Sequence, residues 1–320
     1  MKESIIINGD GKNTKRPASH PRKSNWKLAV LKKSLPVLQH IAPGKVAQVI
    51  WHYFVRPGKA RFSQAQLGLI EKATVETTTY QSYKIATYRW GTTGPKVLLC
   101  HGWRSKVADF RRMIEALVEQ GYVVEGIDMK AHGNSEGEAT ALPEFVEIFK
   151  DHYVKNAPYH TVIGYSLGGL TAGMVMTEIT PNLHPTHLVL IAFPPYVRYF
   201  FHDIIAQAGC NESVYQRFCD FVEKHYHQSV DHFDLRKKLI KITDSNIHLI
   251  YDEDDQTVPI IKGEELWSVT PHATFVRTQK MGHYQIIANK KVIGYITQAI
   301  SQAEKVTGNY TATPANERTS

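Results

Sequence analysis

The sequence predicts an α/β protein built on a doubly wound, mostly parallel sheet. From Lys96 onward, short apolar runs such as Val97 to Cys100 and Tyr122 to Ile127 alternate with stretches of helical spacing. Nearly continuous apolar runs are typical of strands that are buried on both faces of a parallel sheet. Several of these runs lead directly into polar or glycine-rich segments. In doubly wound sheets ligands bind at the carboxyl ends of the strands, so we expect the functional residues at that edge.

Length and composition fit a globular protein. The 320 residues suffice for one large domain with an insertion, and 42% of them are hydrophobic. The three cysteines, Cys100, Cys210 and Cys219, are far apart and lack metal-ligand spacing, so they predict neither disulfides nor a zinc site. The N-terminus has no apolar stretch like that of a signal peptide, and no run of 18 apolar residues follows. We therefore expect a soluble, cytoplasmic protein.

Much of the net charge of +8 lies in a polar, basic N-terminal segment. Its basic residues include Lys12, Lys15, Arg16, Arg22, Lys23, Lys27, Lys32 and Lys33. Residues 1–25 contain no interleaved aromatic residues and no known nucleic-acid motif, so we expect them to form a solvated, disordered tail. An anionic membrane and a nucleic acid are the alternative partners.

Residues 26–60 predict an N-terminal helical extension. Apolar residues recur at helical spacing from Trp26 to Phe54, and Pro36 and Pro43-Gly44 interrupt them, which gives two short amphipathic helices. Their apolar face could pack on a core or on lipid. We expect packing, because the helices are short and the stripes are modest.

The remaining chain predicts a core of residues 61–194 and 244–306. It opens with a hairpin of Ala73 to Tyr80 and Tyr83 to Trp90, rich in threonine, valine and tyrosine. The further strands are Tyr159 to Ile163, His187 to Ala192, Ile247 to Tyr251 and Thr274 to Thr278. The helices are Lys106 to Gln120, Pro143 to Asn156, Leu167 to Thr177, Ile260 to Trp267 and Val292 to Val306. The polar segment 307–320 is expected to be disordered.

A stretch of about fifty residues interrupts this alternation after Phe193-Pro194-Pro195. Residues 195–243 are mostly helical in pattern and rich in aromatic residues. We interpret them as a helical cap insertion over the site. Most of its aromatic side chains are expected to pack the cap against the body, while one or two could line an acyl pocket.

The most informative motif is Gly164-Tyr165-Ser166-Leu167-Gly168-Gly169. It lies between the apolar run Tyr159 to Ile163 and the helical pattern Leu167 to Thr177. A G-x-S-x-G motif between a strand and a helix presents its serine at the tip of a strained turn, with glycines where side chains would collide. The motif predicts that Ser166 is a nucleophile.

A serine hydroxyl is a poor nucleophile unless a histidine takes its proton and a carboxylate orients that histidine. Both residue types follow downstream, in loops at predicted strand ends. One loop carries the four acids of Asp252-Glu253-Asp254-Asp255, and the other carries Gly282-His283. His283 is the predicted base, and the orienting acid is one of the four.

Together these motifs resemble those of the α/β-hydrolase fold enzymes, in which the triad runs Ser, then Asp or Glu, then His. Cys100-His101-Gly102-Trp103 resembles the family's His-Gly oxyanion loop, and the stretch from Asp128 to Ser135 resembles the turn after the fourth strand. Asp255-Gln256-Thr257-Val258-Pro259 is similar to the family's acid turn, D-x-x-V-P. The resemblance covers roughly Ala73 to Val306.

The acid turn favours Asp255 over Asp252 and Asp254 as the orienting acid. Near Asp252 the family usually has a small residue, often glycine, so this position departs from the pattern. Trp103-Arg104 is a second departure, because it is bulky beside the oxyanion loop. It could narrow the pocket, direct Arg104 at an acidic substrate, or leave Arg104 on the surface.

The resemblance implies a serine hydrolase that cleaves carboxylic esters or thioesters with the triad Ser166, Asp255 and His283. It places the oxyanion between the backbone N–H groups of Trp103 and Leu167. It assigns supporting roles to His101, Gly102, Gly164 and Gly168. It implies no metal and no organic cofactor. Relatives with an aspartate nucleophile, the haloalkane dehalogenases and epoxide hydrolases, are disfavoured because Ser166 occupies that position.

The expected partner is a small-molecule or lipid-like acyl substrate, with no nucleic acid and at most weak peripheral membrane contact through the N-terminus. The alternative activities are a carbon-carbon bond hydrolase, an acyltransferase and a membrane-associated lipase. A non-catalytic binding protein of the same fold is least favoured, because every expected site residue is present. The sequence leaves the substrate and the oligomeric state open.

Overall fold

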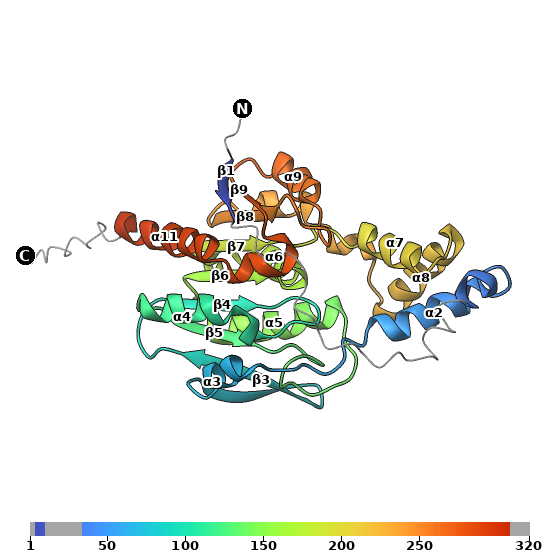
Figure 1. Ribbon diagram of the computed structural model, residues 1–320, viewed down its shortest axis with the longest axis horizontal. Coiled ribbons are helices and arrows are strands. Elements are labelled where there is room, and N and C mark those ends of the chain that lie inside the picture. The colour runs from blue at the N-terminus through green and yellow to red at the C-terminus, as the bar shows by residue number, and fades with distance from the viewer. Residues whose placement is uncertain (1–3, 10–33, 308–320) are drawn as a thin grey trace, which may run out of the picture.

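The chain folds around a twisted, mostly parallel sheet with helices on both faces (Figure 1). The computed structural model describes residues 4–9 and 34–307. Their strands are β1 (Ile5–Asn8), β2 (Thr74–Tyr80), β3 (Tyr83–Trp90), β4 (Lys96–Cys100), β5 (Val123–Ile127), β6 (Thr161–Tyr165), β7 (His187–Ile191), β8 (Asn246–Asp252) and β9 (Thr274–Gln279).

These strands lie in the order β1-β9-β8-β7-β6-β4-β5-β3-β2. Neighbours from β1 to β5 pair in parallel, whereas β3 is antiparallel to both β5 and β2. The predicted fold class, a doubly wound α/β sheet, is confirmed. Apart from β1, each strand lies within about two residues of its predicted bounds.

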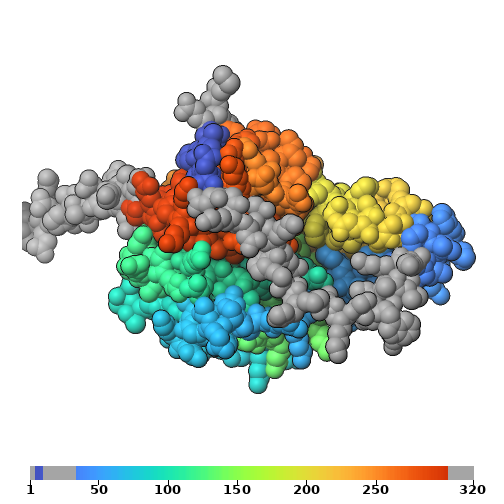
Figure 2. Space-filling view, in the orientation of Figure 1, coloured from blue at the N-terminus to red at the C-terminus, as the bar shows by residue number. Residues whose placement is uncertain are grey.

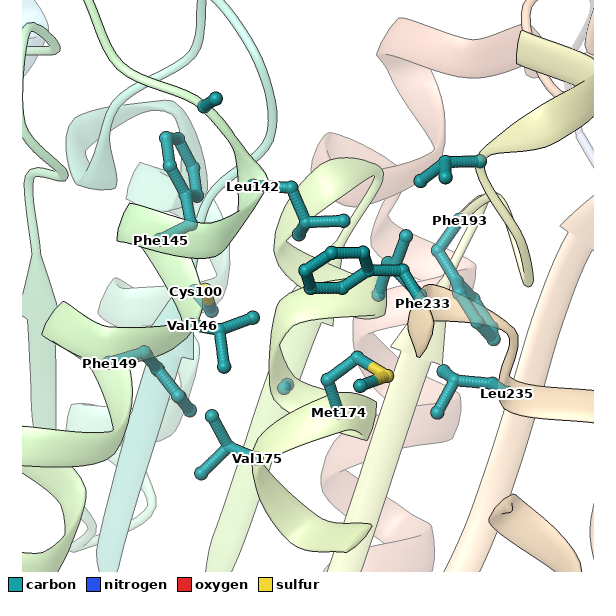
Figure 3. Packing of buried hydrophobic residues seen from close by; sticks show 14 of the residues in the cluster. Cys100, Leu142, Phe145, Val146, Phe149, Met174, Val175, Phe193, Phe233 and Leu235 are labelled. Carbon is teal, nitrogen blue, oxygen red and sulfur yellow. The ribbon is translucent and has the colours of Figure 1, made fainter. Parts of the chain in front are cut away.

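Two hydrophobic clusters fill the two faces of the sheet. On one face, α4 (Arg111–Glu119) and α11 (Lys290–Thr307) cover the strands. On the other face lie α5 (Leu142–Asn156), α6 (Leu167–Glu178) and α9 (Ile260–Val269). Figure 3 shows Phe145 and Phe149 of α5 beside Met174 and Val175 of α6, all buried. The residue types agree with this placement, because α6 is apolar on all sides and is buried along most of its length.

The cap is helical and packs on this second face. It contains α7 (Arg198–Gln207), α8 (Glu212–Tyr226) and the short 3₁₀ turns η3 (Val230–Phe233), η4 (Leu235–Lys237) and η5 (Leu239–Lys241). Leu235 fits against Gly173 of α6, where a Cβ would lie 2.5 Å from the leucine Cδ1. Several aromatic residues of the cap join the core, namely Phe201, Tyr215, Phe218 and Phe233. Most of the cap's aromatic side chains therefore serve packing.

The N-terminal extension packs on the cap. Residues 34–38 are helical, and α2 (Pro43–Phe54) starts at the proline that was predicted to interrupt the helical pattern. The buried stripe of α2 faces α8, and its Trp51 ring lies 5.7 Å from Phe218 and 5.9 Å from Tyr226, centroid to centroid. Figure 1 shows α2, α7 and α8 together at one end of the molecule.

The structure corrects the prediction that residues 1–25 form a disordered tail. Residues 5–8 form β1, which pairs in parallel with β9 in the register Ile5 with Val276. The three consecutive isoleucines have high strand propensity, which favours a strand here in spite of the basic residues of the segment. The rest of the predicted tail, residues 26–33 and the C-terminal segment 308–320 lie outside the described residues.

The helix α3 (Gln64–Ile70) was also not predicted. Ser63 and Gln66 form a capping box at its start: the serine hydroxyl accepts from the Gln66 N–H, and the glutamine side chain accepts from the Ser63 N–H. Ser-x-x-Gln is therefore the sequence signal that would have found it. No helix in the described segments is long and apolar enough to cross a membrane.

Candidate active site

Ser166 occupies a strained turn between β6 and α6. Its φ of 53° and ψ of −127° lie outside the common regions for a residue with a side chain. A Cβ on Gly164 would lie 2.6 Å from the Gly168 carbonyl oxygen, and a Cβ on Gly168 would lie 2.2 Å from that of Cys100. The close approaches explain why the motif needs glycine on both sides of the serine.

The structure brings the three predicted triad side chains into one hydrogen-bonded chain. His283, in α10 (Gly282–Gln285), places its Nε2 3.1 Å from Ser166 Oγ and its Nδ1 2.7 Å from Asp255 Oδ2. The other oxygen of Asp255 accepts the N–H groups of Thr257 at 2.7 Å and Val258 at 2.8 Å. The ionised carboxylate fixes the Nδ1–H tautomer, because it can only accept. Nε2 is then free to accept the serine proton.

Asp252 has a different position from Asp255. Its side chain is fully buried and accepts the N–H groups of Gly282 at 2.8 Å and Met281 at 3.2 Å, together with the Thr278 hydroxyl at 2.7 Å. These bonds tie the end of β8 to the loop that carries the histidine. Asp252 is therefore placed to position His283 through the backbone.

Asp254, the third candidate acid, is exposed. Its carboxylate accepts the Lys280 N–H at 2.7 Å and makes no hydrogen bond to His283 in the described chain. Among the candidate acids of this loop, geometry therefore selects Asp255 as the partner of the histidine.

The two predicted oxyanion donors lie beside Ser166. A Cβ on Gly102 would be 2.7 Å from Ser166 Cβ, so the backbone of the Gly102-Trp103 loop passes directly against the serine. Leu167 is the first residue of α6, and its N–H lies at the positive end of that helix. Within residues 4–9 and 34–307, neither the Trp103 N–H nor the Leu167 N–H has a hydrogen-bond acceptor. Both are available to a substrate oxygen.

His101 holds this loop through a neutral ring. It is fully buried, its Nδ1–H donates to the Gly102 carbonyl at 2.8 Å, and its Nε2 accepts the Met129 N–H at 3.0 Å. Burial lowers the pKa of the ring, which keeps Nε2 unprotonated and able to accept.

His132 fastens the same loop from the turn after β5, a role that the sequence did not indicate. Its Nδ1–H donates to the Lys130 carbonyl and its Nε2 accepts the Arg104 N–H, both at 3.0 Å. Burial, with the neighbouring His101, lowers the pKa of His132 to about 3. The two neutral histidines together fix the path of the oxyanion loop.

Trp103 joins an aromatic wall that includes the N-terminal extension. Its ring stacks on Phe54 at 5.6 Å between centroids and 20° between planes, and Phe200 of the cap lies 6.0 Å from Phe54. The side chain of Arg104 is exposed. Of the possibilities left open for this pair of residues, the structure places Arg104 at the surface, and the Trp103 ring packs against Phe54 and Phe145.

Tyr165 makes a second contact within the site that the sequence did not reveal. Its hydroxyl donates to the His283 carbonyl oxygen at 2.9 Å, and the two rings are 5.2 Å apart. The variable position of the G-x-S-x-G motif therefore supports the backbone of the base, a contact that sequence spacing does not predict.

The described residues hold no group of three or more histidine, cysteine, aspartate and glutamate side chains placed to bind a metal ion. His225 and His227 of the cap are exposed, and His232 lies 3.1 Å from Glu178.

Comparison with known proteins agrees with this architecture. A family model described as serine aminopeptidase S33 matches residues 92–200, about a third of the chain, from before the oxyanion loop to the start of the cap. A search of curated protein sequences gave no match.

Solved structures are similar over most of the chain at low sequence identity. Mouse α/β-hydrolase domain-containing protein 10 is 16% identical, covers 75% of this chain and 100% of its own, and has a TM-score of 0.58. An esterase of Pyrococcus furiosus is 20% identical, covers 79% of this chain and 97% of its own, and has a TM-score of 0.56. A putative lipase of Acinetobacter baumannii is 16% identical, covers 78% and 98%, and has a TM-score of 0.56.

At these identities the likeness establishes the fold. The sheet order, the serine at the turn between β6 and α6, and the acid and histidine loops after β8 and β9 agree with it. The chain therefore has the α/β-hydrolase fold, and residues 92–200 are similar to the serine aminopeptidase S33 family.

Proposed function

We propose that this protein is a serine hydrolase that cleaves carboxylic esters or thioesters through an acyl-enzyme. The observation that carries the proposal is the hydrogen-bonded chain from Ser166 Oγ through His283 to Asp255, next to two N–H groups without acceptors in the described chain. A nucleophile, a base, an orienting acid and an oxyanion site are the parts that acyl transfer needs.

In the acylation step, His283 Nε2 takes the proton of Ser166 as Oγ bonds to the acyl carbon. The carbonyl oxygen becomes an oxyanion between the N–H groups of Trp103 and Leu167. One such donor lowers the activation barrier by about 3 kcal/mol. Asp255 remains ionised and stabilises the imidazolium. His283 then gives its proton to the leaving oxygen or sulfur as its bond to the acyl carbon breaks.

Deacylation repeats these steps with water. His283 removes a proton from the water as its oxygen attacks the acyl carbon of the acyl-enzyme. The oxyanion forms at the same two N–H groups, and its collapse breaks the bond to Ser166 Oγ. The imidazolium returns the proton to the serine, and the acid product leaves.

The names of the similar folds support the acyl-substrate class, since they include esterases, a putative lipase and a thioesterase domain. The same triad serves carbon-carbon bond hydrolases and acyltransferases. A carbon-carbon bond hydrolase would cleave a diketone-type substrate but would give little turnover of simple esters. An acyltransferase would form more transfer product as an alcohol acceptor is added.

Two measurements on the full chain test the proposal. A fluorophosphonate probe is expected to label Ser166, as located by mass spectrometry, and p-nitrophenyl esters of increasing chain length are expected to turn over. Ser166→Ala should lose both signals. Ser268→Ala, at an exposed serine in α9, is the matched control and should keep them. Labelling without turnover of any ester or thioester would leave the nucleophile in place and refute the substrate class.

A further inference from the structure

The charge of the chain is concentrated in one stretch. Of the 38 lysine and arginine residues, 12 lie between residues 11 and 70, a stretch with no aspartate or glutamate. The rest of the chain therefore carries a net charge of −4, although the whole chain carries +8. A basic stretch on an otherwise acidic protein indicates an anionic partner for this part of the chain.

The same stretch presents three exposed aliphatic side chains, which we call the tip. Val37 is 66% exposed, Leu38 is 45% exposed and Ile41 is 81% exposed, at the turn between the helical residues 34–38 and α2. In Figures 1 and 2, α2 forms the outer edge of the end that it shares with the cap. Single exposed apolar residues are common on protein surfaces, but three within five residues form a small patch.

The turn is fixed, so the tip is held outward. Gln39, between the exposed residues, is buried; its Nε2 donates to the Pro36 carbonyl at 2.8 Å and its Oε1 accepts the Asn211 N–H of the cap at 2.7 Å. Leu35 is buried as well. The polar glutamine faces the protein and the aliphatic residues face solvent, the reverse of the usual distribution.

Basic residues lie near the tip. Lys45 is exposed on α2, and Gln48 and His52 share its face at helical spacing without an acid among them. Lys33 and Lys32 lie four and five residues before Val37, so even a fully extended chain keeps them within about 18 Å of it. The adjoining segment 195–230 contributes three basic and four acidic residues, too few acids to cancel the basic stretch.

We propose that the tip docks on an anionic lipid bilayer, with Val37, Leu38 and Ile41 entering the interface and the net positive charge of residues 11–70 attracting the headgroups. A nucleic acid also offers anionic groups, but it takes up aliphatic side chains only where its bases are unstacked, which costs free energy. A lipid surface accepts both, because apolar insertion and attraction to anionic headgroups add in interfacial binding. Each lysine or arginine near such a surface raises the affinity about fivefold.

Docking would bring lipid to the active site. Helix α2 has 12 residues and is about 18 Å long, with the tip at its start and Phe54 at its end. Phe54 stacks on Trp103 next to the serine. The aromatic wall therefore begins one helix length from the docked surface. The inference that acyl chains are taken from the bilayer rests on the proposed function. The inference that the tip docks on a bilayer does not.

The test is co-sedimentation of the full chain with vesicles of phosphatidylcholine alone and of phosphatidylcholine mixed with phosphatidylglycerol. The protein carries Ser166→Ala so that no lipid is consumed. We expect binding to the anionic vesicles that added salt weakens. The triple variant Val37→Ser, Leu38→Ser and Ile41→Ser should reduce that binding by at least about tenfold, because each removed aliphatic group forfeits burial.

A matched triple variant controls for the loss of apolar surface. Val75→Ser, Val154→Ser and Ile261→Ser change residues that are 51%, 48% and 52% exposed on other elements, and this variant should bind like the parent. Equal binding by the tip variant would show attraction by charge alone and overturn the proposal. Binding to a nucleic-acid duplex but not to vesicles would also overturn it.

Activity is measured separately on protein with Ser166 intact. The tip variant is expected to keep wild-type turnover of a soluble short-chain p-nitrophenyl ester and to lose turnover of an ester embedded in anionic vesicles. Docking without turnover of any ester or thioester would support the proposed surface and refute the proposed function. Equal turnover of the embedded ester by both proteins would refute delivery from the bilayer.

Discussion

Replacing Asp252 by asparagine tests whether a buried carboxylate positions the catalytic base from a distance. The carboxylate accepts the Gly282 and Met281 N–H groups and the Thr278 hydroxyl, and it is completely buried. Asparagine keeps one acceptor oxygen and puts an NH₂ group where the second oxygen was. That NH₂ faces an N–H or a hydroxyl, so at least one charge-assisted bond is lost.

The size of the effect follows from these bonds. A buried N–H left without an acceptor costs about 1–3 kcal/mol, and weakened bonds to the lost charge add to this. We expect Asp252→Asn to lower the free energy of unfolding by about 2–4 kcal/mol. The loop that carries His283 would shift, and a displacement near 1 Å lowers kcat by about a hundredfold. KM should change much less, because no contact to the substrate is removed.

The assay combines ester kinetics with urea unfolding for Asp252→Asn and for Asp254→Asn. Asp254 is exposed and accepts a single backbone N–H, which an asparagine oxygen can keep while its NH₂ faces solvent. Its variant should stay within about twofold of wild type in kcat, as most surface substitutions do. Equal losses in the two variants, or a wild-type kcat in Asp252→Asn, would refute the positioning role.

Three further predictions follow from the site and the core. Asp255→Asn should lower kcat by about 10⁴-fold with little change in stability, because an amide favours the wrong tautomer of the histidine; ester kinetics measure it. Gly168→Ala should prevent or severely weaken folding, because its Cβ would meet a carbonyl oxygen at 2.2 Å, whereas Gly44→Ala, which meets nothing within 4 Å, should be tolerated; thermal unfolding compares them. His187 and His248 are buried, and desolvation lowers the pKa of each to about 4. Between about pH 6.5 and pH 4 the unfolded chain binds more protons than the folded chain, so the free energy of unfolding should fall as the pH drops through this window. The lowered pKa of His248 alone accounts for about 3 kcal/mol of this fall. His187→Leu should flatten the dependence measured by urea unfolding at a series of pH values.

The sequence predicted most of the fold because its signals are local. Continuous apolar runs marked the strands of a sheet that is covered on both faces, and the motifs followed directly at their carboxyl ends. In a parallel sheet those ends share one edge, so segments as distant in sequence as Ser166, Asp255 and His283 converge there. Their geometry is that of a triad, and their catalytic roles stay predictions.

The contacts that the sequence did not reveal are those that depend on pairing between distant segments. β1 pairs with β9, although the two strands are separated by most of the sequence. The three isoleucines of β1 have high strand propensity, but propensity does not predict which edge of the sheet the strand joins. Tyr165 reaches the His283 carbonyl, and Phe54 stacks on Trp103, through side-chain directions set only by the folded backbone. The sequence showed that Asp252 departs from the family pattern. It did not predict the position of its carboxylate, because that depends on which N–H groups the folded loop brings to it.

The N-terminal extension cannot be tested by deletion, because one element serves both packing and the proposed docking. The buried stripe of α2 includes Ala47 at 0% and Trp51 at 7% exposure, and its last residue, Phe54, stacks on Trp103 of the oxyanion loop. Removing the extension would expose the α8 surface and release that loop, so lost activity would not reveal which contact mattered. The tip lies on the solvent side of the same element, and Ile41 is 81% exposed. Substitutions there leave the packed side of α2 intact, so a change in vesicle binding with unchanged turnover of soluble esters would separate docking from folding.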